Sequence, residues 1–188
     1  MVFNFFHLIL ICDTMNSDKG FFSVLDERRS IRAYKKRDVE KEKLDKILAA
    51  ANSAPSAGNL QAYEIVVVKN KENKEAIADA AFGQDFIAQA PFVLVFCANQ
   101  ERSAVRYGAR GRDLYSIQDA TIAASYAQLA STALGLGSVW IGAFDEFAVK
   151  KIISADKPIA IIPIGYPDEK AEETKRRSDN IVHKEKIS

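Results

Sequence analysis

Residues 28–32 read Arg28-Arg29-Ser30-Ile31-Arg32, which places three arginines and a hydroxyl within five residues. A guanidinium presents a planar fork of N–H donors, so this group of side chains suits a dianionic phosphate. The alternative is a solvated helix end, where basic side chains favour the negative end of the helix dipole. The residues alone leave both interpretations open.

A second candidate for chemistry is the segment 54–61, which reads APSAGNLQ and leads into a β-branched run. It combines a hydroxyl, two side-chain amides and a turn-forming backbone. The amides of Asn59 and Gln61 could read a ring that has both donor and acceptor edges. A plain turn is the alternative interpretation.

The third candidate is the segment 135–144, GLGSVWIGAF, in which Gly142 and Ala143 follow an apolar run. Small residues there would let a flat ring lie against the backbone and accept an N–H hydrogen bond. A tight corner between a strand and a helix is the alternative. Gly135 and Gly137 lack the third glycine of a dinucleotide-binding loop and precede a strand, so they indicate a helix stop.

Other chemistries find little support in the residues. The two histidines, His7 and His183, lie in the terminal segments, and no HExxH, CxxC or GxSxG pattern occurs. The sequence therefore predicts neither a metal site nor a side-chain nucleophile. Lys and Arg number 26 against 25 Asp and Glu, and this balance argues against a broad nucleic-acid surface. Only two cysteines, Cys12 and Cys97, are present, which favours a reducing compartment.

Alternating helices and strands must position these three segments. Leu44, Ile47, Leu48 and Ala51 follow helical spacing in an amphipathic helix over 40–54. Two apolar runs predict strands buried on both faces, at 63–69 and 92–98. Further helices are expected at 21–29, 71–81, 113–134 and 145–153, and further strands at 138–142 and 158–165. The polar stretch 99–112, with two glycines, predicts a mobile loop.

The pattern predicts one α+β domain, an α/β three-layer sandwich around four central strands. The length of 188 residues, 48% hydrophobic and 27% charged, is sufficient for one core. Residues 1–12 are mostly apolar but too short to span a bilayer, and they lack the features of a signal peptide. Either translation begins at Met15, or this segment packs on its own or a partner subunit.

Taken together, RRSIR, APSAGNLQ and GLGSVWIGAF, in this order around a long Ala-rich helix, resemble the nitroreductase family of FMN-dependent oxidoreductases. The resemblance extends from about residue 21 to 183. It implies a nitroreductase-like FMN-binding domain over 19–188, after an extension of uncertain role at 1–18. It also implies a mainly antiparallel sheet flanked by helices, and a homodimer with two flavins and a swapped C-terminal arm. The Ala-rich helix would form the dimer core.

The resemblance also implies how residues meet the cofactor. The RRSIR segment would hold the flavin, with a cation near N1 that stabilises the reduced ring. Residues of the 54–61 loop would meet the ring, partly from the other subunit, and the end of the 138–142 strand would face N5. A terminal K-x-R would close on the phosphate, although Arg176 could be the residue in register. The cofactor-binding residues implied are Arg28, Arg29, Ser30, Arg32, Pro55, Ser56, Ala57, Asn59, Gln61, Gln84, Ile141, Gly142, Ala143, Lys175 and Arg177.

The implied function is a cytoplasmic FMN-dependent NAD(P)H oxidoreductase. It would transfer hydride in a ping-pong manner through flavin N5 to a flat acceptor such as a nitroaromatic or quinone, with no catalytic side chain, no metal, and no nucleic-acid or membrane partner. Many members carry an acidic residue where Gly142 stands, and larger members carry a helical excursion where 99–112 is expected to be a short loop. In the 99–112 loop of this chain, the residues expected to face the substrate are Arg106, Tyr107 and Arg110. The short loop keeps flavin fragmentation and reductive dehalogenation open, and the lack of an acid–base residue keeps a non-catalytic flavin-binding dimer open.

Overall fold

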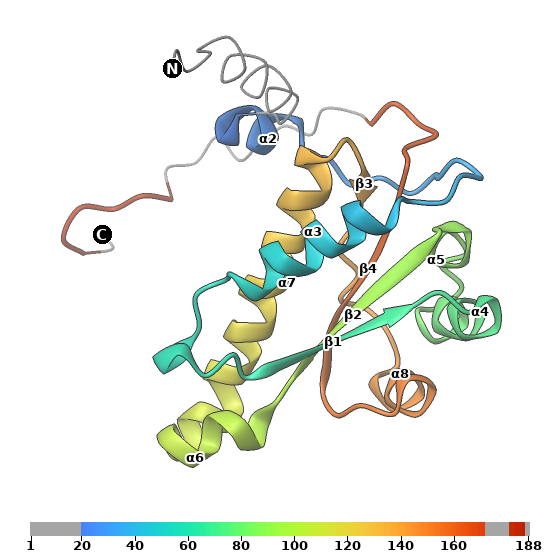
Figure 1. Cartoon of the computed structure of the whole chain (residues 1–188). Coiled ribbons are helices and arrows are strands. Elements are labelled where there is room, and N and C mark those ends of the chain that lie inside the picture. The colour runs from blue at the N-terminus through green and yellow to red at the C-terminus, as the bar shows by residue number, and fades with distance from the viewer. Residues whose placement is uncertain (1–19, 172–180, 187–188) are drawn as a thin grey trace, which may run out of the picture.

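A four-stranded antiparallel sheet forms the centre of the computed structural model, which describes residues 20–171 and 181–186 (Figure 1). Its strands are β1 (Tyr63–Val68), β2 (Phe92–Ala98), β3 (Gly137–Ser138) and β4 (Pro158–Gly165). They lie in the order β1-β2-β4-β3, and every neighbouring pair is antiparallel. The expectation of a mainly antiparallel sheet is therefore confirmed.

Helices cover both faces of this sheet, which confirms the three-layer arrangement. One face carries α3 (Lys41–Asn52) and α7 (Ser116–Ala133), and the other carries α4 (Lys71–Ala80), α5 (Phe86–Gln89) and α8 (Glu146–Ile153). The short helix α2 (Phe21–Glu27) lies beside α7. Successive side chains of β2 point to opposite faces, so Leu94 and Phe96 enter the first core while Val93 and Val95 enter the second.

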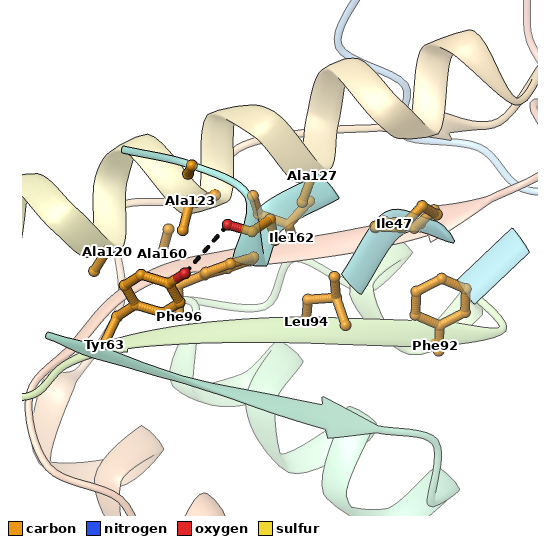
Figure 2. Close-up of a cluster of buried hydrophobic side chains, with 14 of the residues drawn as sticks. Ile47, Tyr63, Phe92, Leu94, Phe96, Ala120, Ala123, Ala127, Ala160 and Ile162 are labelled. Carbon is orange, nitrogen blue, oxygen red and sulfur yellow. Dashed lines mark hydrogen bonds between the residues drawn. The ribbon is translucent and has the colours of Figure 1, made fainter. Parts of the chain in front are cut away.

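The core under α7 depends on its alanines (Figure 2). Ala120, Ala123 and Ala127 have no exposed surface and pack with Phe96 and Ile162 of the sheet. A residue with only a methyl group lets the helix backbone approach the strands closely. These alanines therefore face the sheet of their own chain. The dimer role expected for this helix stays a prediction.

Two predicted strands differ from the observed ones. β1 lies at the edge of the sheet and is not buried on both faces, because Tyr63 and Val68 are buried whereas Glu64 and Val67 are exposed. The predicted strand over 138–142 is reduced to the two residues of β3 and a single bridge between Ile141 and Ile161. The strand order accounts for both differences, because β1 and β3 are the two edge strands and each has a neighbouring strand on one side only.

The predicted loop at 99–112 is wrong, because this segment is largely helical. Helix α6 spans Gln100–Arg110 and continues into a π-helical turn, η3 (Gly111–Tyr115), ahead of α7. The side chain of Asn99 accepts a hydrogen bond from the N–H of Arg102 and caps the helix. Only Ser103 of α6 is buried, so this helix has no buried apolar face. Its polar residues and its glycine favoured the loop prediction.

Several expectations fall on residues that the structure does not describe. The extension at 1–18 and the phosphate-closing residues Lys175 and Arg177 all lie outside the described ranges. Their roles remain predictions.

Candidate functional site

The arginine segment lies directly against the start of the third strand. Ser30 bridges Ser138 in the parallel sense, and the N–H of Ile31 donates to the carbonyl of Ser138 at 3.1 Å. A Cβ on Gly137 would stand 2.7 Å from the side chain of Ile31, so only glycine permits this approach. Two of the three sequence motifs, RRSIR and GLGSVWIGAF, are therefore brought together at one end of the sheet (Figure 1).

The arginines of this segment have different surroundings. Arg28 ends helix α2 and is half-buried. Arg29 turns back on the helix end, where its guanidinium donates to the carbonyls of Asp26 and Arg28. The side chain of Arg32 is exposed, and its backbone N–H donates to the carboxylate of Glu169. The donor set is three guanidiniums with the exposed hydroxyl of Ser30, and its chemistry fits a phosphate dianion.

The end of the third strand offers an open backbone surface. Ile141 is 3% exposed and exchanges two 3.0 Å hydrogen bonds with Ile161, whereas Gly142 and Ala143 are exposed. A Cβ on Gly142 would meet only the side chain of Trp140, at 3.5 Å. Among the described residues, none accepts a hydrogen bond from the N–H of Gly142 or Ala143. This small-residue surface with available donors fits a flat ring that accepts an N–H hydrogen bond.

Gln84 lies in the turn between α4 and α5, on the sheet face that also carries the strand end. Its amide donates to the carbonyl of Ala81 at 2.8 Å. The same turn region receives the chain after the strand, because the N–H of Asp145 donates to the carbonyl of Ala80 at 2.8 Å. The amide of Gln84 is thus engaged by its own turn, and its role toward a flavin ring stays a prediction.

The 54–61 loop has an unusual backbone. It contains a short 3₁₀ turn, η2 (Ala57–Asn59), and Gly58, Asn59 and Gln61 all have positive φ angles of 57°, 58° and 43°. Left-handed backbone is uncommon outside glycine, and it is retained where the surroundings enforce it. Here the amide of Gln61 donates to Asn59 Oδ1 at 2.6 Å, and the Gln61 N–H donates to the hydroxyl of Ser56 at 3.0 Å.

A buried carboxylate that sequence reasoning missed holds this loop in place. Asp119 of α7 is 2% exposed, and its two carboxylate oxygens accept hydrogen bonds from the N–H groups of Ala57 and Ala62. An acidic residue inside an otherwise Ala-rich helix was the available signal. Beside it, the loop residues Pro55, Ser56 and Ala57 line a hollow of about 510 Å³ together with Tyr115.

The loop and the arginine segment lie at opposite ends of α7 within one chain (Figure 1). Asp119 contacts the loop near the start of the helix, whereas Gln128 reaches the Ser138 hydroxyl, at 3.4 Å, near its end. Nine residues of helix separate these two anchors by roughly 14 Å, at 1.5 Å per residue. The structure therefore brings two of the three motifs together and keeps the third apart.

The free thiol in the described part of the chain belongs to Cys97, which is buried. Burial raises the pKa of the Cys97 thiol to about 12, which leaves it protonated and unreactive at neutral pH. Burial also raises the pKa of Tyr34, beside the arginine segment, well above its usual value.

No cluster of three His, Cys, Asp or Glu side chains able to hold a metal ion occurs in the described part of the chain. Within residues 20–171 and 181–186, no helix is long and apolar enough to cross a membrane.

The chain is similar to known proteins over most of its length. The family profile described as Nitroreductase matches residues 25–85 and 81–166. The chain is 35% identical over 170 residues to a putative NADH dehydrogenase/NAD(P)H nitroreductase of Archaeoglobus fulgidus, covering 85% of this chain and 94% of that protein. It is 34% identical over 182 residues to the FMN reductase [NAD(P)H] of Bacillus subtilis, covering 86% of this chain and 72% of that protein. The solved structure of an FMN-dependent nitroreductase from Clostridium difficile superposes with a TM-score of 0.75 at 36% identity, covering 88% of this chain and 99% of that chain.

Proposed function

This chain belongs to the nitroreductase family, and on that premise we propose how its residues serve the chemistry of the family. The protein is an FMN-dependent NAD(P)H oxidoreductase. Bound FMN supplies the two-electron chemistry between the nicotinamide donor and the acceptor. The finer assignments, which are the residues that hold the cofactor, the acceptor and the oligomeric state, are proposals.

The observation that carries the proposal is the pairing of Ser30 with Ser138. It supports the proposal because it brings the guanidinium and hydroxyl donors of the RRSIR segment beside the strand that precedes Gly142 and Ala143. Arg28, Arg29 and Ser30 would hold the cofactor phosphate, and Arg32 would supply positive charge near the ring. The exposed N–H groups of the strand end would donate to the ring edge.

Because the third motif lies at the far end of α7, we assign its role to a second copy of the chain. Residues 55–57 of one subunit would complete the site of the other. Exposed apolar side chains support a homodimer, since Phe21, Phe22 and Leu25 of α2 are 63%, 77% and 41% exposed. A patch of this kind at a helix that contacts α7 favours burial against a partner. The FMN-binding domain would comprise residues 19–188, and the protein would work in the cytoplasm.

The proposed acceptor is a flat molecule such as a nitroaromatic or a quinone. No side chain of the described site needs to move a proton, because bound FMN would supply the two-electron chemistry. The motive for other flavin chemistry was a short loop at 99–112, and that motive no longer holds because the segment is helix α6.

Anaerobic stopped-flow absorbance tests this function. We expect the yellow colour of the FMN-saturated protein to bleach on mixing with NADH or NADPH, and to return on adding a nitroaromatic or a quinone. No bleaching with either donor would overturn the proposal. Light scattering coupled to gel filtration checks the dimer, and a mass of 20.8 kDa rather than twice that value would contradict it.

A further inference from the structure

The surface formed by α6 and η3 carries unbalanced positive charge. Residues 100–115 contain four arginines against two acidic residues. Two of the arginines are neutralised, because Arg102 pairs with Glu64 at 2.5 Å and Arg112 pairs with Glu101 at 2.9 Å. The other two, Arg106 and Arg110, form no ion pair with any residue that the structure describes.

Tyrosine rings hold these two guanidiniums in position. Arg106 lies over the ring of Tyr107 and Arg110 over that of Tyr115, each 5.4 Å from the ring centroid. The two tyrosines meet edge to face at 5.2 Å, and Arg110 Nε donates to the Tyr115 hydroxyl at 2.9 Å. Stacking restricts a guanidinium without neutralising it, so its remaining N–H groups stay available to an anion.

Arg106 and Arg110 stack on two tyrosines, one of which, Tyr115, lies at the hollow beside the 54–61 loop. Tyr115 lines that hollow with residues 55–57. The loop also contacts Arg106 and Tyr107 directly. Gly58 lies so close to the ends of these two side chains that a Cβ on Gly58 would stand 2.8 Å from the Arg106 guanidinium. Arg106 also reaches the Gly58 carbonyl at 3.4 Å. The unpaired arginines are therefore part of the same surface as the loop assigned to the flavin site.

We propose that Arg106 and Arg110 bind a phosphate group of the pyridine dinucleotide that donates electrons, which rests on the proposed function. Guanidinium forks match phosphate oxygens in geometry and charge. Of the reactants in the proposed reaction, the flat acceptors carry no phosphate, whereas the dinucleotide carries a pyrophosphate and, in NADPH, a further 2′-phosphate. The arginine pair would then contribute to the choice and affinity of the donor.

Titration calorimetry of the FMN-saturated protein with NADP⁺ and, separately, with NAD⁺ tests this binding. The variant R106Q/R110Q removes both guanidiniums from exposed positions, and R112Q removes one from the neighbouring ion pair as a matched control. We expect the double variant to bind NADP⁺ about tenfold or more weakly, because a hydrogen bond to a charged group contributes roughly that factor. The flavin spectrum and melting temperature should stay those of the unaltered protein.

The two ligands identify which phosphate is recognised. Weaker binding of NADP⁺ alone assigns the pair to the 2′-phosphate, and equal weakening of both ligands assigns it to the pyrophosphate. The variant R106K/R110K should recover part of the affinity, because it restores the charge without the fork. Unchanged binding of both ligands in R106Q/R110Q, or the same loss in R112Q, would overturn the proposal. If the unaltered protein oxidises neither NADH nor NADPH, the proposed function fails, while the calorimetric comparison still decides the role of the arginine pair.

Discussion

The carboxylate of Asp119, buried in α7, accepts a hydrogen bond from the backbone N–H of Ala57 at 2.9 Å. Its second oxygen accepts from Ala62 at 3.3 Å. One side chain thus fixes both ends of a loop whose backbone is left-handed at Gly58, Asn59 and Gln61. A buried charge is retained where such hydrogen bonds satisfy it, so Asp119 is a positioning residue for this part of the site.

Replacing Asp119 by asparagine tests that role. An amide keeps the shape but offers one acceptor oxygen, and it turns an NH₂ group towards a backbone N–H. We expect D119N to lower the free energy of unfolding by about 1–3 kcal/mol, measured by urea denaturation. Asp113 is exposed in the same region, so D113N is the matched control and should stay within about 0.5 kcal/mol. Equal effects of the two changes would argue against a clamping role.

The phosphate assignment predicts that R28A weakens FMN binding. Loss of a charge-assisted contact should cost about 1.5–3 kcal/mol, which is roughly a 10- to 150-fold rise in the dissociation constant of FMN. Quenching of flavin fluorescence on titration with the flavin-free protein measures this constant. Lys36 is exposed and nearby, so K36A removes a like charge as the control. Unchanged flavin affinity in R28A would count against the assignment.

The open backbone surface at Gly142 gives a test that separates folding from binding. The φ angle of Gly142 is not positive, and a Cβ there meets only ordinary contact with Trp140, so G142V should fold normally. Its branched side chain would cover the surface assigned to the ring. We expect the flavin dissociation constant to rise about tenfold or more, which is about 1.4 kcal/mol.

The graded variant G142A controls for this effect, because one methyl group covers less of the surface. Its effect on flavin affinity should be smaller, and the melting temperature of both flavin-free variants should match that of the unaltered protein. Full flavin affinity in G142V would place the ring elsewhere.

The docking of the arginine segment predicts coupling between Gly137 and Ile31. A methyl group at Gly137 would lie 2.7–2.8 Å from three carbons of Ile31, so G137A should cost about 1–3 kcal/mol of unfolding free energy. I31A removes two of those carbons, the γ carbons, and keeps Cβ, at the cost of a cavity of its own. In urea denaturation, the double variant should therefore be less destabilised than the two single changes combined. Strict additivity would show that the two residues do not meet.

Local patterns in the sequence were sufficient for much of the fold. The spacing of Leu44, Ile47 and Ala51 predicted α3, and the observed helix buries those three residues. The apolar runs at 92–98 and 158–165 predicted strands. The structure confirms both as β2 and β4, which form the centre of the sheet. These elements bury their own apolar side chains, so their structure follows from residues that are close in sequence.

The sequence by itself also indicated the family and the segments proposed to bind the cofactor, because those motifs consist of consecutive residues. Only the tertiary structure decided how they are placed: that Ser30 lies against Ser138, and that the 54–61 loop is anchored by Asp119 at the other end of α7. The tertiary structure also decided that residues 100–110 form helix α6. A side-chain cap and long-range bonds from Arg102 to Gln61 and Glu64 stabilise this helix in place of a buried apolar face. Such contacts join residues far apart in sequence, and no local period or propensity records them.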